Sequence, residues 1–317
     1  MFRRRQRLLA NSALFMQTAR MTNPRKPRPL DHLVLPTLDL AASQKRHEQL
    51  GFIVAAKGVH PFGTENACVY VTDGTFLEPL AIGQRETAEA ASLDGNQFTA
   101  RDAAFRFRKG QEGFSAIVLG SDDAAGDQAQ FERGGVSAGK ILDFGRDFAG
   151  PDGKTARMDF RLTFAADLRS PDSFFITCQR INVPKADRSK LVDHENGAVS
   201  IKTVLMSEPN PTDFQYLLQE VVNERQVEAH SFGMDVKTGM ATLSVLTHPG
   251  LKDFYDLDTH GDRRGILMRG IVFGVSDLAK TRYLLTSRAV AFVEKAGKLI
   301  VKPTAGQGAA YVFEAAQ

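Results

Sequence analysis

Short apolar runs alternate with helix-like segments along most of this 317-residue chain. The first run, residues 32–37, leads to Asp39, a residue type that caps helix N-termini, and the helix-like segment that follows stops at Gly51. Three more apolar runs are separated by Gly, Pro and Asp-Gly turn signals, and they cover residues 52–58, 66–72 and 75–82. The pattern predicts a strand, a helix and three strands, which together make a βαβββ module.

The same order of elements recurs three more times along the chain. The second copy begins near Phe114, the third at Ala198 and the fourth at Leu267. In each copy a polar residue type that favours helix caps stands between the first strand and the helix. A single short apolar run is ambiguous between a strand and a buried helix, but four copies in one order are harder to obtain by chance.

Four βαβββ modules predict an α+β fold with two domains, because one module cannot cover both faces of its own sheet and has to pair with another. We expect an N-terminal domain over residues 30–182 and a C-terminal domain over residues 199–317. The polar segment 183–198, which contains Pro184 and Gly197, is the expected linker.

Residues 1–29 differ from the rest of the chain in charge. Residues 1–30 hold eight Arg or Lys and no acid, so the formal net charge of +3 leaves −5 (3 − 8) for the remainder. We expect a disordered basic extension, and an organellar targeting segment or a true start at Met21 are the alternatives. No basic stripe with interleaved aromatic residues follows, so a nucleic-acid partner is not expected.

Two features of the sequence bear on where the protein works. No run approaches the ~18 uninterrupted apolar residues that a membrane span requires. The two cysteines, Cys68 and Cys178, each lie in an apolar run, which indicates buried, inert thiols and no disulfide framework. We therefore expect a cytoplasmic protein without a membrane partner.

The motifs "DHLVLPTLDL", "LGFIVAAKGVHPFGTENACVYV" and "GTFLEPLAI" lie within residues 31–82 and resemble the vicinal oxygen chelate superfamily, more narrowly its glyoxalase-like domain family. The resemblance extends through about Arg180, and beyond that residue it rests on the module pattern. It implies that each pair of modules curls its mixed sheet around a cleft, with helices outside. It also implies a divalent metal in the cleft, held by residues of the first and last strands and chelated by neighbouring substrate oxygens.

The resemblance places His32 at the ligand position of the first strand and Glu78 at that of the last strand. This pair suits Zn, Fe, Mn, Co or Ni and does not choose among them. Gln179, with water, would complete the shell, and Glu78 or Glu65 would act as the catalytic base. The alternatives are that His32 only pairs with a carboxylate such as Asp31, and that Glu78 faces solvent.

The other modules depart from this ligand pattern. The second module has Ala116 at the histidine position, and its last strand offers Thr177 or Gln179 where a carboxylate or histidine is expected. In the fourth module Gly270 takes the histidine position, although Glu314 matches the glutamate. We expect the C-terminal domain to serve as a scaffold or a lid for the first.

Three further residues are candidates for substrate binding. His60 and Asn66 lie in a Gly-Pro loop that runs into a strand, where they would hydrogen-bond a ligand or serve only turn chemistry. Arg180 would clamp an acidic ligand, or would lie in water at the end of its strand. His47 falls on the polar face of the first helix, and we expect it to be solvated.

Two functions follow from the residues and the resemblance. The first is a divalent-metal-dependent lyase or isomerase of the glyoxalase type, acting on a carbonyl or vicinal-oxygen group of a small substrate. The second is a non-catalytic protein that sequesters a small molecule, as bleomycin-resistance proteins of the superfamily do. The sequence has no phosphate-binding glycine loop, so we expect a small-molecule ligand and no nucleotide cofactor. The sequence does not decide whether the protein forms a homodimer whose chains share a site.

Overall fold

The computed structural model describes residues 26–149, 155–183, 187–259 and 264–316. The predicted basic extension therefore lies outside the described residues, apart from its last four positions. Across these described ranges, no helix is long and apolar enough to cross a membrane.

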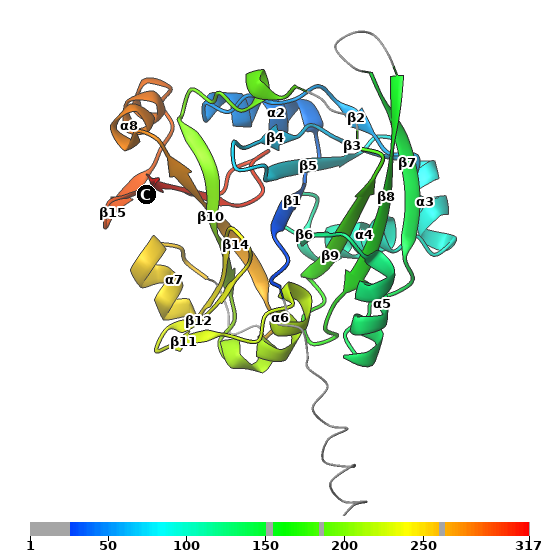
Figure 1. The fold of residues 1–317 in the computed structure, drawn as a ribbon. Coiled ribbons are helices and arrows are strands. Elements are labelled where there is room, and N and C mark those ends of the chain that lie inside the picture. Colours follow the sequence, from blue (N-terminus) through cyan, green and yellow to red (C-terminus); the bar gives the residue numbers. More distant parts are fainter. Residues whose placement is uncertain (1–25, 150–154, 184–186, 260–263, 317) are drawn as a thin grey trace, which may run out of the picture.

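The first half of the chain forms one mixed, curled sheet of nine strands with helices on its outside (Figure 1). The strand order is β2-β3-β5-β1-β6-β9-β8-β7, and β4 pairs with β5. The strands are β1 (Leu30–Pro36), β2 (Gly58–Val59), β3 (Thr64–Asn66), β4 (Val69–Tyr70), β5 (Phe76–Ile82), β6 (Ala116–Ser121), β7 (Leu142–Ala149), β8 (Thr155–Ala165) and β9 (Phe174–Ile181). The helices are α2 (Leu40–Gln49), α3 (Arg85–Leu93), α4 (Gln97–Lys109) and α5 (Ala124–Arg133).

The second half forms an eight-stranded sheet in the order β11-β12-β13-β10-β14-β17-β16-β15. Its strands are β10 (Ala198–Ser207), β11 (Glu228–His230), β12 (Gly233–Lys237), β13 (Thr242–Leu246), β14 (Leu267–Val275), β15 (Val293–Lys295), β16 (Lys298–Val301) and β17 (Ala310–Ala315). The helices are the short 3₁₀ turns η1 (Ser189–Leu191) and η2 (Pro211–Phe214), and α6 (Gln215–Val222), α7 (His248–Tyr255) and α8 (Leu278–Ser287).

Both halves repeat one pairing pattern. The first and last strands of each module lie side by side in parallel, as in β1 with β5, β6 with β9, β10 with β13 and β14 with β17. The two modules of a half join through their first strands, which pair antiparallel in β1 with β6 and in β10 with β14. The predicted α+β fold of paired βαβββ modules is confirmed.

Helices α3 and α4 were not predicted, and they matter for the site. They fill the stretch between the first and second modules, where Asn96 caps α4 by accepting hydrogen bonds from the backbone N–H groups of Phe98 and Thr99. Phe98 packs in the same buried cluster as Val34 and Leu80 of the first sheet. Phe98 of α4 therefore reaches the concave face of that sheet and closes one side of its cleft.

The convex faces of the two sheets, behind their concave faces, share one hydrophobic core. Successive side chains of a strand point to opposite faces. The outward residues Leu33, Ile117 and Phe175 of the first sheet belong to the same buried cluster as Ile201 and Phe273 of the second. The two halves are therefore packed against each other rather than joined only by the chain.

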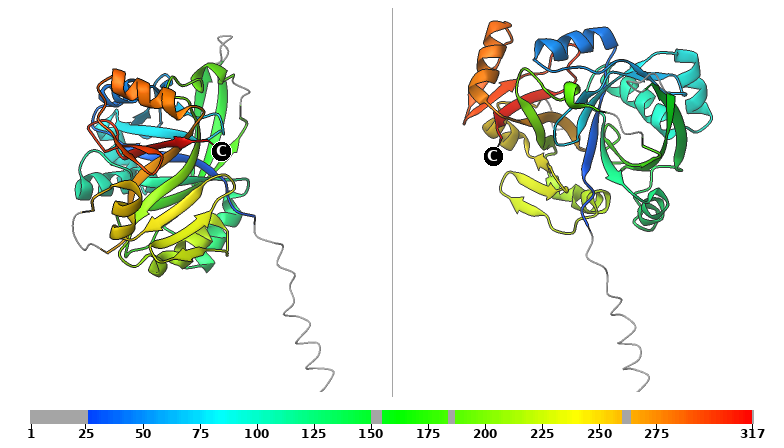
Figure 2. Two further views of the ribbon diagram at one scale, coloured as in Figure 1. Left: turned by 90° about the vertical axis from the view of Figure 1, so that its left-hand side faces the viewer. Right: turned by 45° about the horizontal axis from the view of Figure 1, so that its top comes forward.

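Phe52, just after α2, carries much of this contact between the halves. Its ring centroid lies 5.2 Å from that of Phe273, 6.0 Å from that of Tyr311 and 6.1 Å from that of Phe313, all from the second half. Nearby, the Arg288 side chain at the end of α8 donates a hydrogen bond to the Glu48 carbonyl of α2. Figure 2 shows these two helices, blue α2 and orange α8, side by side at the same end of the molecule.

Arg28 fixes the start of β1 between helices of both halves. It is buried, and its Nη2 lies 2.6 Å from the Asp127 carboxylate of α5. Its Nη1 donates hydrogen bonds to the carbonyl oxygens of Glu220 and Val221 of α6, at 2.9 and 2.8 Å. Arg28, expected to belong to the extension, is thus part of the packed body.

The expectation that His47 is solvated is wrong. Its side chain is fully buried, and its Nδ1–H donates to the Ser43 carbonyl at 2.8 Å, while its Nε2 lies 2.7 Å from the Tyr311 hydroxyl. The polar face of α2 does not meet water there, because the second half of the chain covers it.

This burial predicts a loss of stability as the pH falls from about 6.5 to about 4. Burial lowers the pKa of His47 to about 4, whereas the unfolded chain returns it to 6.5. Below pH 6.5 the unfolded state binds a proton that the folded state does not, so stabilisation that is complete above pH 6.5 is lost progressively toward pH 4. The difference between the two pKa values corresponds to about 3 kcal/mol.

Urea unfolding at pH 7 and at pH 4.5 measures this effect on the free energy of unfolding. His47→Gln should remove part of the pH-dependent loss, and His230→Gln, at an exposed histidine, should leave it unchanged. An equal loss in the wild type and in His47→Gln would contradict the assignment to His47.

Candidate functional site

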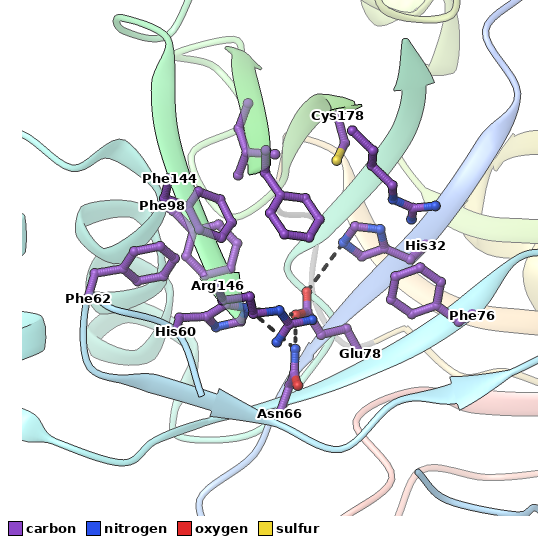
Figure 3. A pocket seen from close by; sticks show the side chains of 13 residues that line it. His32, His60, Phe62, Asn66, Phe76, Glu78, Phe98, Phe144, Arg146 and Cys178 are labelled. Carbon is purple, nitrogen blue, oxygen red and sulfur yellow. Dashed lines mark hydrogen bonds and ion pairs between the residues drawn. The ribbon is translucent and has the colours of Figure 1, made fainter. Parts of the chain in front are cut away.

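A small cavity of about 50 Å³ lies on the concave face of the first sheet. Strands β1, β3, β5, β7, β8 and β9, helix α4 and the loop between β2 and β3 all contribute side chains to it (Figure 3). The lining residues are His32, His60, Phe62, Asn66, Phe76, Glu78, Phe98, Phe144, Arg146, Phe160, Leu162, Cys178 and Arg180. The cavity therefore contains five of the six predicted site residues.

His32 and Glu78 meet because of the register between β1 and β5. His32 lies opposite Phe76 and Val34 lies opposite Glu78, so the alternating side chains His32 and Glu78 point to the same face. His32 Nε2 lies 3.3 Å from Glu78 Oε2, and both side chains are buried. The His32 ring also stacks on Phe76, with centroids 4.4 Å apart.

Asp31 holds the other side of the His32 ring. Its Oδ1 lies 2.5 Å from His32 Nδ1 and also accepts a hydrogen bond of 2.5 Å from Arg180 Nη2. The sequence-based alternative for His32, a pairing with Asp31, thus occurs together with the contact to Glu78. One imidazole ring lies between two carboxylates.

His60 and Asn66 approach Glu78 from the opposite side. Asn66 Nδ2 donates a hydrogen bond of 2.6 Å to Glu78 Oε1, and His60 Nε2 lies 3.7 Å from the same oxygen. Figure 3 shows His32 on one side of the carboxylate and His60 and Asn66 on the other. His60 Nδ1 is 2.9 Å from the Thr64 hydroxyl within the same loop, so this residue serves both the turn and the site.

These contacts set the charges in the cavity. Burial alone would raise the pKa of Glu78, but the hydrogen bond and charge of His32, with Asn66, lower it to about 2. Burial alone would lower the pKa of His32, yet its hydrogen bonds to Asp31 and Glu78 outweigh burial and raise it. Burial lowers the pKa of His60 to about 4, so its ring is neutral near pH 7. An ionised carboxylate therefore lies between one proton-donating and one neutral imidazole.

The structure does not bring Gln179 to His32 and Glu78. Its Oε1 accepts a hydrogen bond from the backbone N–H of Ala124, and its Nε2 donates one to the Asp122 carbonyl at the start of α5. The physical reason is strand alternation, because the neighbours Cys178 and Arg180 on β9 point into the cavity and Gln179 points away. Gln179 therefore lacks the position of a metal ligand.

Glu65, the second candidate for the base, is also outside the cavity. Its carboxylate pairs with Lys57 Nζ at 2.9 Å. The two buried thiols lie where the sequence indicated, and burial raises the pKa of Cys178 to about 12, so this lining residue is a neutral thiol.

The second module has no ligands at the positions that match His32 and Glu78. In the first module, Glu78 on the last strand lies opposite Val34, two residues after His32 on the first strand. The same spacing in the second module makes Ala116 the counterpart of His32, and Ile176, opposite Val118, the counterpart of Glu78. Both counterparts are apolar and buried. The sequence offered Thr177 or Gln179 near the last-strand ligand position of this module, but the register puts neither of them at that position.

The donor set does not fit a metal ion of the superfamily type. The 3.3 Å between His32 Nε2 and Glu78 Oε2 suits two ligands of one ion, since such metal–ligand bonds are about 2.0–2.2 Å. Within the part of the chain that the structure describes, however, no group of three or more His, Cys, Asp or Glu side chains could hold an ion. Metal centres in proteins normally use three or more such ligands.

The concave face of the second sheet carries a buried apolar cluster. Leu205 and Leu246 of the sheet pack there with Leu251 of α7. Glu314 lies opposite Gly274 and not opposite Val272, two residues after Gly270, so Gly270 and Glu314 do not both match His32 and Glu78; Glu314 pairs with Lys202 at 2.6 Å.

Sequence reasoning missed the apolar wall of the cavity and Arg146. Phe144 and Arg146 come from β7, Phe160 from β8 and Phe98 from α4, and none belongs to a motif. A hint was the 22 phenylalanines in a chain without tryptophan. Their convergence on one cavity depends on how the β7–β8 hairpin and α4 fold over the sheet.

The paired modules, the curled sheets and the buried His32–Glu78 pair define a protein of the vicinal oxygen chelate superfamily. A family described as "Glyoxalase-like domain" matches residues 30–222, which is more than half of the chain. The chain belongs to this glyoxalase-like domain family. Sequence comparison with curated proteins finds no match.

Three solved structures have a similar fold over most of the chain. A hypothetical protein from Staphylococcus aureus is 13% identical with a TM-score of 0.62, covering 91% of this chain and 99% of its own. A mutant of 4-hydroxymandelate synthase from Streptomyces coelicolor is 12% identical with a TM-score of 0.54, covering 92% and 94%. The Mn(II)-bound glyoxalase from Novosphingobium aromaticivorans is 11% identical with a TM-score of 0.50, covering 91% and 82%. At such identities the likeness concerns the fold alone.

Proposed function

We propose that the protein is an enzyme that moves a proton beside a carbonyl group of a small, oxygen-rich substrate, in a lyase- or isomerase-type reaction. The observation that carries the proposal is the buried Glu78 carboxylate, which faces a cavity between the His32 ring and the Asn66 amide. Its pairing with His32 and Asn66 offsets the cost of burying the charge and keeps the carboxylate ionised beside the cavity.

The residues divide the reaction between a base and an acid. Glu78 accepts the proton from the carbon next to the carbonyl, and the Nε2–H of His32 donates a proton to the carbonyl oxygen. The product is an enol, or an enediol where that carbon carries a hydroxyl group. Reversal of the two transfers at the neighbouring carbon gives the isomer. Asp31 accepts a hydrogen bond from His32 Nδ1 and keeps Nε2 aimed into the cavity.

The metal-dependent form of this reaction stays a prediction. One structural neighbour is a Mn(II)-bound glyoxalase, but the apolar Ala116 and Ile176 stand at the second pair of ligand positions here. We therefore assign the polarisation of the carbonyl to His32. Metal analysis of the purified protein tests this assignment. A stoichiometric divalent ion that is lost in both His32→Ala and Glu78→Ala would overturn it, and an unchanged melting temperature in EDTA would support it.

Deuterium exchange tests the proton transfer itself without knowledge of the natural substrate. Incubation in D₂O with hydroxyacetone and with 2-oxobutyrate, followed by proton NMR, should show loss of the signals next to the carbonyl faster than without protein. Saturable binding of these compounds without any exchange would favour the second function, sequestration, which the apolar lining of the cavity also suits.

A further inference from the structure

Two arginines and two carboxylates lie at the cavity. Arg146, Arg180 and Glu78 are among its lining residues, and Asp31 pairs with Arg180 beside it. His60 is neutral near pH 7, because burial lowers its pKa to about 4. The permanently charged Arg180 gives the cavity a group that attracts an anionic ligand.

Arg180 is placed to meet such an anion. Its Nη2 donates to Asp31 at 2.5 Å, which fixes the guanidinium, and its Cζ lies 5.6 Å from the centroid of the Phe76 ring. A guanidinium carries five N–H donors, and among the described residues Asp31 is the one carboxylate paired with it. Its other side-chain hydrogen bond is with the neutral Cys178 thiol, which a second anion could replace.

Arg180 can also be reached from solvent. Besides the cavity, its side chain lines an open groove on the surface, together with Asp31 and Cys178. It is half-buried, whereas His32 and Glu78 lie deeper. The groove also contains Asp122, Asp123 and Asp127 beside Lys26 and Arg28.

The rest of the cavity wall is apolar and the space is small. Phe62, Phe98, Phe144 and Leu162 are among its lining residues. The volume of about 50 Å³ holds only a few non-hydrogen atoms, since one water molecule needs about 10–15 Å³ on this measure. The ligand body that fits is therefore short.

We propose that the substrate is a small carboxylate whose short body carries the reacting carbonyl, and that Arg180 binds its carboxylate group. This inference rests on the proposed function, because it names the substrate class of the same site. The carboxylate binds the guanidinium in place of the Cys178 thiol, and the body extends along the phenylalanines toward Glu78. Since an arginine binds a carboxylate by paired charge-assisted hydrogen bonds, an uncharged amide of the same shape binds more weakly.

Butyrate and butyramide are a matched pair of probes for this proposal. They have the same carbon skeleton, and they differ in the charge of one group. Titration of each into the full-length protein, followed by NMR chemical shifts, gives the two dissociation constants. We expect butyrate to bind at least tenfold more tightly than butyramide, and this preference to shrink in high salt.

The variants Arg180→Met and Arg180→Lys test whether Arg180 is the source of the preference. Arg180→Met should reduce the preference for butyrate over butyramide to less than about twofold. Arg180→Lys should keep part of this preference, because lysine retains the positive charge but lacks the planar guanidinium that makes two hydrogen bonds to one carboxylate. Arg161→Met is the matched control, since Arg161 lies on neighbouring β8, outside the cavity, and pairs with Asp143. Its preference should equal that of the wild type.

Several outcomes overturn the proposal. Equal affinity for the two probes, an unchanged preference in folded Arg180→Met, or no binding of either probe would each do so. If Arg180→Met does not fold, a salt-independent preference in the wild type would overturn it instead. Deuterium exchange on neutral hydroxyacetone but not on 2-oxobutyrate would leave the proposed function standing and reject the carboxylate.

Discussion

Glu78→Gln is expected to reduce the rate of deuterium exchange by about a thousandfold. A positioned general base contributes about 10²–10⁴-fold to such a reaction. Glutamine keeps the size and hydrogen-bonding oxygen of glutamate but cannot accept a proton from carbon. Because the amide oxygen can still accept the hydrogen bond from Asn66, the loss should appear in the rate and not in the folding.

Glu65→Gln provides the matched control, because Glu65 lies on the adjacent strand β3 and pairs with Lys57 outside the cavity. Its exchange rate should stay within about twofold of the wild-type rate. A Glu78→Gln protein that is folded and exchanges at the wild-type rate would reject Glu78 as the base. A loss of exchange in Glu65→Gln would move the base to that residue.

Phe52→Ala is expected to destabilise both halves of the protein together, by about 3–5 kcal/mol. Truncation of a buried phenylalanine costs this amount, because apolar surface is lost and a cavity remains. Phe52 comes from the first half and packs against Phe273, Tyr311 and Phe313 of the second. Both sheets therefore lose a wall of their shared core.

Urea unfolding followed by far-UV circular dichroism and by tyrosine fluorescence measures this effect. We expect a single transition in both signals, shifted to lower urea in Phe52→Ala. Phe107→Ala is the control, since Phe107 is 92% exposed and its truncation should change the free energy of unfolding by less than about 0.5 kcal/mol. Two separate transitions, of which only one moves, would contradict a shared core.

The order of elements could be predicted because it depends on local signals. Apolar runs, helix caps such as Asp39 and Asp277 and turn residues act over a few neighbouring positions, and both aspartates do cap their helices. The stretch 85–109 escaped prediction although it has its own cap at Asn96, because it has no counterpart in the other modules.

The pairing of His32 with Glu78 could also be anticipated, through the resemblance of the first module. The same resemblance could not exclude Gln179 as a metal ligand. Whether a residue on β9 faces the cavity depends on the pairing of β9 with β6 and β8, which places Cys178 and Arg180 inside. A shift of one residue reverses the face of every side chain on a strand.

The sequence by itself therefore determined the βαβββ modules, their pairing into an α+β fold and the presence of His32 and Glu78 in the first module. Only the tertiary structure decided that His47 is buried, that Arg180 lies beside Asp31 and that phenylalanines from β7, β8 and α4 line the cavity. The physical reason is the distance along the chain over which each kind of interaction acts. Caps, turns and alternation act between near neighbours in the chain, whereas burial and charge pairing depend on contacts such as that of His47 with Tyr311, 264 residues apart.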